Sequence, residues 1–282
     1  MFASLGRTWD LTKLSWRVLK KDRELVLFPV FAAVALLILA GLMSGIGAAT
    51  GTLARLDGGT EQLTAVDVGL LAVTYFLLAF VLIYFNAALI GAAMVRLGGG
   101  DPHMRDGFRL ANRRLPQILG WALISATVGL LLQALRNQSR DNFLGQIAIS
   151  LVGGVWAYLT FFVVPVLVAE GIGPIAAIKR SGSLFKRTWG EQVVANFGFG
   201  LLSLGAALIG AIPAIAIASI SVPAGIAVGV VTVGLGLAVV ASLEAIFKSA
   251  LYGYVADGRV AEGFTRESLA GAYRPGSQPR SA

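Results

Sequence analysis

Long stretches without a charged residue constrain the fold of this chain more than any other feature of its sequence. Four stretches contain no Asp, Glu, Lys or Arg and are each long enough to cross a bilayer once: 25–53, 68–95, 115–135 and 143–169. A charge inside hydrocarbon costs several kcal/mol, so the charged clusters between these stretches mark loops. With 56% hydrophobic and only 13% charged residues, the composition is wrong for a soluble domain.

A fifth uncharged stretch, between Glu191 and Glu244, is long enough to cross the membrane twice. Ser219, Ser221 and Pro223 predict a turn near its middle, because proline suits the first turn of a helix. The two spans expected here are 192–218 and 223–247. The sequence therefore predicts an all-α polytopic membrane domain with six transmembrane helices over 1–262, followed by a flexible tail over 263–282.

The distribution of Lys and Arg predicts the orientation of the spans. The segments on one side of the expected membrane hold twenty of these residues, and the segments on the other side hold three: Arg55, Arg136 and Arg140. Because cytoplasmic loops carry the excess of positive charge, we expect both termini to be cytoplasmic. The first residues contain acidic side chains and no short apolar core, so we expect no cleaved signal segment.

Three basic segments, 2–21, 102–114 and 174–189, precede the first, third and fifth spans. Apolar residues recur in each at three- and four-residue spacing, which predicts a helix lying in the membrane interface. The apolar stripes are Phe2, Leu5, Trp9, Trp16 and Leu19; Met104, Phe108, Ala111 and Leu115; and Ile175, Ile178, Phe185 and Trp189. Seven-residue sequences that begin at Ser15, Gly107 and Ser181 also align weakly with one another. This favours three copies of one unit, an interfacial helix followed by a transmembrane hairpin, although the positive-inside rule alone explains basic segments before spans equally well.

A net charge of +8 can indicate nucleic acid binding, but here the cations flank apolar spans, so we expect anionic lipid headgroups as partners and no nucleic acid. The predicted lipid- or partner-binding residues are Arg17, Lys20, Lys21, Arg109, Arg113, Lys179, Arg180, Lys186, Arg187, Trp16 and Trp189. Small-residue pairs such as Gly41/Gly45 and Gly225/Gly229 allow close helix packing, within one chain or in a homo-oligomer.

Polar residues inside the expected spans are the other place to look for function. Asn86, Gln133, Asn196 and Glu244 are the candidates for a polar path. Hydrogen bonds between helices are the simpler explanation for the amides, and an ion pair with Lys248 is the simpler one for Glu244. Pro165 and Pro213 are expected to kink or break their helices.

Catalytic and metal-binding patterns are weak in this sequence. There is no cysteine, and the single histidine, His103, stands near Asp101 and Asp106 at a spacing better explained by a helix cap at Asp101–Pro102. Gly171 to Ala176 imitates a dinucleotide-binding turn but follows a membrane span rather than a strand. We therefore expect no cofactor, no metal and no enzymatic activity.

The segments from Pro165 to Pro174, from Ile178 to Ser181 and from Leu184 to Glu191 resemble an uncharacterised family of prokaryotic six-span membrane proteins. The resemblance extends from the Trp9 segment to the sixth span, and it implies a prokaryotic cytoplasmic membrane and an all-helical fold. A looser similarity exists to the membrane domain attached to some glycerophosphodiester phosphodiesterases. Neither resemblance implies an activity.

Two functions compete after these observations. The first is a non-enzymatic membrane protein whose basic cytoplasmic helices bind anionic lipid or a protein partner, with a membrane-organising or complex-forming role. The second is a transporter or channel for a small solute or lipid, favoured by the proline-containing spans and the repeat.

Overall fold

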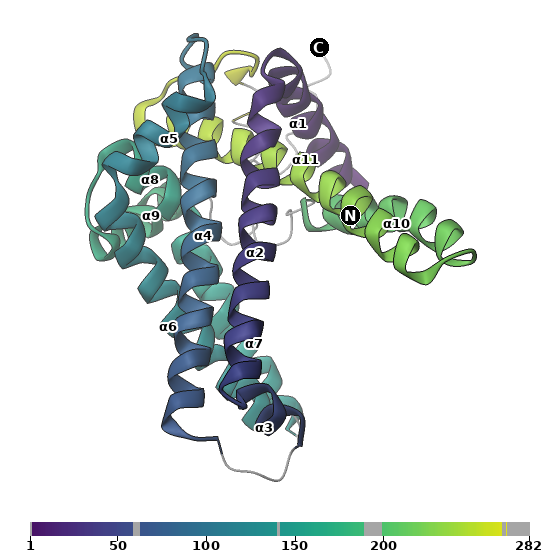
Figure 1. Ribbon diagram of the computed structural model, residues 1–282. Coiled ribbons are helices and arrows are strands. Elements are labelled where there is room, and N and C mark those ends of the chain that lie inside the picture. The colour runs from purple at the N-terminus through teal and green to yellow at the C-terminus, as the bar shows by residue number, and fades with distance from the viewer. Residues whose placement is uncertain (1, 59–62, 140–141, 189–198, 267–268, 270–282) are drawn as a thin grey trace.

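The computed structural model describes residues 2–58, 63–139, 142–188, 199–266 and 269. Figure 1 shows that these residues form a helical bundle, with no strand in the described part of the chain. The helices are α1 (Phe2–Lys21), η1 (Arg23–Val26), α2 (Leu27–Ala49), α3 (Thr52–Gly58), α4 (Ala65–Leu97), α5 (Met104–Arg113), α6 (Leu115–Gln138), α7 (Phe143–Thr160), α8 (Val163–Glu170), α9 (Pro174–Thr188), α10 (Phe199–Ala218) and α11 (Val222–Asp257).

Six of the described helical segments are long and apolar enough to cross a membrane, which confirms the predicted all-α polytopic fold. They are Arg23–Ala49, Ala65–Leu97, Leu115–Gln138, Phe143–Glu170, Phe199–Ala218 and Val222–Asp257. The first span ends at Ala49 rather than at the expected residue 53, because the chain turns at Gly51 and begins the short helix α3. The start of the fifth expected span, 192–198, lies outside the described residues.

The fourth span is broken between α7 and α8, at Phe161 and Phe162. Pro165 is the physical cause, because a proline cannot donate to the carbonyl four residues earlier, here that of Phe161, and its ring crowds that carbonyl. The Phe162 N–H instead donates to the Ser181 hydroxyl of α9 at 2.9 Å, and both residues are fully buried. The break predicted from Pro165 is therefore present and capped from a neighbouring helix, whereas α10 continues through Pro213.

The residues at the end of α8 form hydrogen bonds with three other helices, α6, α9 and α11. Gly171 ends α8 with a left-handed backbone (φ 67°), and a side chain at this position would collide with the Arg114 guanidinium. Gln117 of α6 donates to the Gly171 carbonyl at 3.2 Å. Glu170 accepts hydrogen bonds from Arg180 of α9 at 3.0 Å and from Tyr252 of α11 at 2.9 Å. The residues that imitate a dinucleotide-binding turn thus form a helix cap.

Helix α11 extends ten residues beyond the expected end at 247 and reaches Asp257. Glu244 and Lys248 ended the uncharged stretch in the sequence, but they form an ion pair of 2.7 Å on one face of the helix, so the helix continues past them. At 1.5 Å per residue, Glu244 lies about 20 Å from the end of α11. Helix α11 is therefore longer than the sequence predicted, and the placement of Glu244 at the cytoplasmic end of the sixth membrane span stays a prediction.

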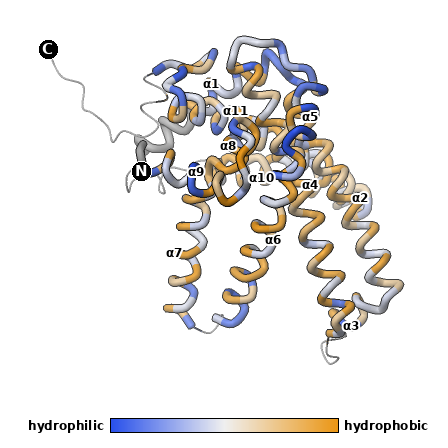
Figure 2. Tube along the Cα trace, turned by 90° about the vertical axis from the view of Figure 1, so that its left-hand side faces the viewer, coloured by the Kyte–Doolittle hydropathy of each residue, from blue (hydrophilic) through white to orange (hydrophobic). Residues whose placement is uncertain are grey.

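The α10–α11 hairpin runs in a different direction from the other two. In Figures 1 and 2 the α2–α4 and α6–α7 pairs extend the same way, whereas α10 and α11 are inclined to the side. Close packing inside this hairpin depends on glycine, since a Cβ at Gly225 would meet Ala218 at 2.5 Å and one at Gly210 would meet the Val233 backbone at 2.9 Å. Positions 41 and 45, by contrast, face open space, so that glycine pair does not pack within the chain.

Helices α1, α5 and α9 confirm the predicted basic helices, and all three lie at the same end of the bundle, away from α3 (Figures 1 and 2). We call this end, defined by α1, α5 and α9, the basic end. The inner faces of these helices pack on protein: Leu184 and Phe185 of α9 and Val18 of α1 are at most 3% exposed. The predicted stripes are only partly wrong: Leu19, Ala111 and Phe185 pack on protein instead of facing lipid, whereas Trp16 and Ile175 are exposed. The side chains of Phe2, Leu5, Trp9 and Trp189 lie outside the described residues.

The three aligned segments share one pattern of burial. Ser15, Gly107 and Ser181 occupy the first aligned position, and all three are buried. A Cβ at Gly107 would meet the Ala88 carbonyl oxygen at 2.5 Å, so this contact between α5 and α4 requires glycine. Four positions later, Leu19, Ala111 and Phe185 are also buried, whereas the next position is exposed in each helix. The order of helix and hairpin therefore repeats three times with a common buried face, but the third hairpin does not follow the direction of the first two.

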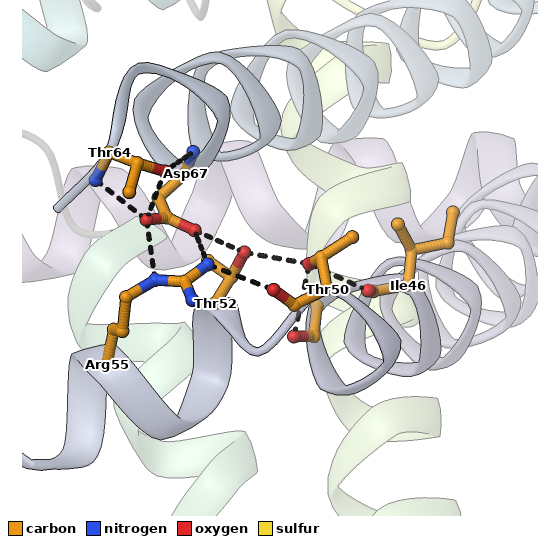
Figure 3. A network of polar contacts seen from close by, with 7 residues as sticks. Ile46, Thr50, Thr52, Arg55, Thr64 and Asp67 are labelled. Carbon is orange, nitrogen blue, oxygen red and sulfur yellow. Dashed lines mark hydrogen bonds and ion pairs between the residues drawn. The ribbon is translucent and has the colours of Figure 1, made fainter.

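A polar network closes the end of the α2–α4 hairpin opposite the basic end (Figure 3). Asp67 is fully buried and accepts two hydrogen bonds from Arg55, at 2.8 and 2.5 Å, and one from the Thr52 hydroxyl at 2.6 Å. Its carboxylate also accepts from the backbone and the hydroxyl of Thr64. The network joins α3 to the start of α4 and holds the two long helices together at this end.

The expected tail, 263–282, does not begin where the sequence analysis placed it. Phe264 and Leu269 are buried in the same apolar core as α1 and α11. Glu262 also binds Lys21 of α1 at 2.7 Å. The packed domain therefore extends beyond residue 262, and the remaining residues of the expected tail lie outside the described part of the chain.

Candidate functional site

The predicted lipid-binding cations divide into two groups by their contacts. Arg17, Lys20, Arg113, Lys179 and Lys186 are exposed at the basic end and form no ion pair with a described residue. Lys21, Arg109 and Arg180 are instead paired with Glu262, Asp106 and Glu170. The first group leaves its charge available to a partner, whereas the second group neutralises acidic residues of the chain itself.

Trp16 lies on the outer face of α1 and is 42% exposed. The Lys20 ammonium lies 5.8 Å from the centre of its ring, on the same helix. An exposed tryptophan beside exposed cations is typical of the interface between a membrane and water. Of the other predicted residues, the side chain of Arg187 and the whole of Trp189 lie outside the described residues.

The predicted polar path is only partly assembled. Gln133 points away from the bundle and contacts Asn137 of its own helix at 3.5 Å. Asn196 lies outside the described residues. Asn86 and Glu244 do come together, because both line one cavity of about 480 Å³.

This cavity lies beside the break in the fourth span. Its walls come from α4, α6, α7, α8, α9 and α11, and include Trp121, Phe161 and Pro165. Its polar side chains are Asn86, Tyr158, Thr160, Glu244 and Lys248. The Lys248 ammonium binds Glu244 at 2.7 Å and lies 5.1 Å from the centre of the Phe161 ring. We call this space the break cavity.

The groups around the break cavity carry no net charge, because Glu244 and Lys248 compensate each other. Thr160 donates to the Trp156 carbonyl of its own helix at 2.8 Å. The Asn86 amide forms no hydrogen bond with a described residue. The arrangement can therefore hold a polar group, but it brings together no nucleophile and base pair for catalysis.

The region around His103 is a helix start. The backbone N–H of His103 donates to Asp106 at 3.1 Å, and Asp101 binds Arg96 at 3.0 Å. Arg96 also pairs with the largely buried Asp22. Helix α5 begins at Met104, so the cap is formed by Asp106 and not by Asp101 as the sequence suggested. No group of potential metal ligands is found in the described part of the chain.

Sequence reasoning missed three structural groups. Ser181 caps the helix break, Asp67 anchors the hairpin at the opposite end, and Asp22 binds Arg96 across 74 positions. Ser181 was noted only as part of a motif. Asp67 and Asp22 lie next to expected spans, and acidic residues at span ends are a usable signal for paired structural charges.

Comparison with known proteins assigns the chain to a family. Residues 65–264 match a family of unknown function, DUF6159. The chain belongs to this family. The matched part runs from the start of α4 to Phe264 and contains the helix break, Glu170 with its partners Arg180 and Tyr252, and every residue of the break cavity. No curated protein matches the chain. The predicted membership of an uncharacterised six-span membrane family is thus confirmed, and the looser phosphodiesterase resemblance stays a prediction.

Proposed function

We propose that this protein is a non-enzymatic component of a prokaryotic cytoplasmic membrane that binds anionic phospholipid headgroups at its basic end. Both termini would then be cytoplasmic, and the role would be to organise lipid or a membrane complex. The observation that carries the proposal is a group of exposed cations at one end of a six-span bundle that form no ion pair with a described residue: Arg17, Lys20, Arg113, Lys179 and Lys186.

The way the basic helices are held supports this function. Their inner faces are buried against the spans, so the helices are fixed in place and their outer cations need not be ordered on binding. A basic side chain near an anionic membrane surface contributes about 1 kcal/mol of attraction. Five such residues acting together are enough to select anionic over zwitterionic lipid by much more than tenfold at low salt.

The experiment compares the parent chain with a variant carrying glutamine at all five positions, both reconstituted in nanodiscs of mixed anionic and zwitterionic phospholipid. Lipids retained after purification are counted by native mass spectrometry. We expect the anionic enrichment of the parent to fall at least about tenfold in the variant, and to weaken with salt in the parent.

A variant with Arg136→Gln provides the control, because this exposed arginine lies near the end of α6 farthest from the basic end. It should leave the enrichment unchanged. Equal anionic enrichment in the parent and the five-fold variant would refute lipid binding by these cations and would favour a protein partner instead.

A transporter is a second candidate, because the break cavity joins a proline-broken span to polar side chains that include Asn86 and Glu244. On this proposal Glu244 would contact the solute, and Glu244→Gln would reduce uptake into proteoliposomes while the Arg136→Gln control would not. Absence of flux for a panel of ions and small polar solutes, with folded protein in the vesicles, would reject it.

A further inference from the structure

A second, apolar groove adjoins the break cavity. It measures about 360 Å³ and lies between α2, α4 and α11. Its lining is apolar apart from Asn86, which also lines the break cavity. Asn86 therefore stands where a mixed polar and aromatic space meets an apolar one.

Helix periodicity makes the two spaces continuous. On α11, Leu237 and Ala241 of the groove are followed at three- and four-residue spacing by Glu244 and Lys248 of the break cavity. On α4, Leu82 of the groove precedes Asn86 by one turn. Residues at such spacing lie on one face of a helix, so on α11 an apolar stretch runs directly into a polar one, whereas on α4 Asn86 lies between Leu82 and Ile90.

The change from apolar to polar lining is clearest along α11. Leu237 and Ala241 of the groove lie farther than Glu244 and Lys248 from the C-terminal end of this helix, whereas on α4 the two spaces overlap, since Leu89 lines the groove and Ile90 the break cavity. Apart from Phe185 of α9, the lining residues of both spaces belong to the candidate spans. A lipid would therefore place its headgroup beside the polar side chains of the break cavity and an acyl chain in the apolar groove.

The charges of the break cavity select the kind of headgroup. Glu244 and Lys248 are 33% and 25% exposed and are together neutral, so a net anionic headgroup would gain no net attraction from the pair. A headgroup with both an ammonium and a phosphate can lie against the pair with opposite polarity, the ammonium donating to Glu244 and the phosphate accepting from Lys248. The Asn86 amide is exposed and forms no hydrogen bond with a described residue, so it can supply a further donor to the phosphate.

We propose that the break cavity and the adjoining groove bind a single zwitterionic, primary-amine phospholipid, with its headgroup on Glu244, Lys248 and Asn86 and an acyl chain between α2, α4 and α11. Both volumes lie in the range of known ligand sites. The site differs from the surface of the basic end in position and in selectivity, so it does not depend on the function proposed above.

The test starts from the full chain without mutation. The protein is reconstituted in nanodiscs containing equal amounts of phosphatidylethanolamine, phosphatidylcholine and phosphatidylglycerol, stripped with detergent, and weighed by native mass spectrometry. We expect one retained phosphatidylethanolamine, at least about tenfold above phosphatidylcholine, because the trimethylated amine cannot donate a hydrogen bond to Glu244. Equal retention of the three lipids, or preferred retention of phosphatidylglycerol at this one position, would overturn the proposal.

Two variants locate the lipid. Gly154 lines the break cavity, and no atom lies within 4 Å of a Cβ built there, so Gly154→Phe fills the cavity without removing a contact. Gly41→Phe on α2 is the matched control. A Cβ at Gly41 also has no atom within 4 Å, and Gly41 lines neither the break cavity nor the groove. We expect the single lipid to be lost in the first variant and kept in the second. Retention in both would place the lipid elsewhere and refute the site.

A double variant tests the charges, and comparison with the basic end separates the two proposals. Glu244→Gln with Lys248→Met should abolish the preference for the primary amine while leaving the anionic enrichment at the basic end intact. The five-fold glutamine variant of the basic end should do the reverse. An unchanged amine preference in the double variant would refute the assigned contacts even if a lipid occupies the cavity.

Discussion

Ser181→Ala tests how the break in the fourth span is stabilised. The Ser181 hydroxyl accepts the N–H of Phe162 at 2.9 Å, and both residues have no measurable exposure. Alanine fits the site but leaves this N–H without a partner. The regular helical acceptor of this N–H would be the Tyr158 carbonyl, which the Phe161 N–H approaches instead at 3.5 Å.

The expected destabilisation follows from the cost of a buried donor without a partner, about 1–3 kcal/mol. That range corresponds to roughly a five- to 150-fold lower ratio of folded to unfolded protein. For soluble proteins of this size 1 kcal/mol shifts the melting temperature by about 2–4 °C, so we expect a decrease of several degrees in detergent, measured by intrinsic tryptophan fluorescence.

Ser183→Ala is the matched control for this measurement. Ser183 lies on the same helix, is exposed, and donates only to the Arg180 carbonyl three residues earlier. It should change the melting temperature by less than about one degree. Equal melting temperatures for Ser181→Ala and the parent would show that the Phe162 N–H finds another partner, and would refute the capping role of Ser181.

Further substitutions test other parts of the fold. Gly107→Leu should destabilise the chain strongly, since even a Cβ there meets the facing helix at 2.5 Å; an unchanged melting temperature would contradict the contact between α4 and α5. Asp67→Asn should lower the melting temperature far more than Asp57→Asn, because Asp67 is buried against Arg55 whereas Asp57 is exposed. Equal effects of the two substitutions would refute the anchoring network. The Lys21 ammonium lowers the pKa of Glu262, so this carboxylate stabilises the fold above its ordinary value of 4.5 and loses that contribution as pH falls through the lowered pKa. The melting temperature of Glu262→Gln should therefore differ slightly from that of the parent at pH 7 and converge with it in acid; a difference that persists in acid would refute the pairing.

The course of the chain through the membrane could be predicted from charge and hydropathy, because a bilayer allows few alternatives for long uncharged stretches. The basic helices and the break near Pro165 were also accessible, since each follows from local chemistry. The length of α11 was not, because the uncharged stretch ends at Glu244 and charge alone does not show how far a helix continues; the predicted ion pair of Glu244 with Lys248 is present.

The buried faces of the basic helices were harder to predict than their existence. The apolar stripe of α1 was expected to face the membrane, yet Leu19 of that stripe packs on protein, and so does the small Ser15 next to the exposed Trp16. Small residues at close helix contacts, such as Ser15 and Gly107, have no periodic signal of their own, and the partner surface decides which face is covered. The same holds for the break cavity, since its walls come from six helices and include residues as far apart in sequence as Asn86 and Lys248.

The most direct test of the account is the sidedness of the three basic helices. The chain has no cysteine, so single cysteines in place of Arg17, Asn112, Ser183 and Gln138 can be labelled in sealed, oriented vesicles with a membrane-impermeant maleimide. The account predicts that the first three react from one side, the cytoplasmic one, and that the fourth reacts only from the other. A cysteine in any one basic helix that reacts from the side opposite to the other two would contradict it.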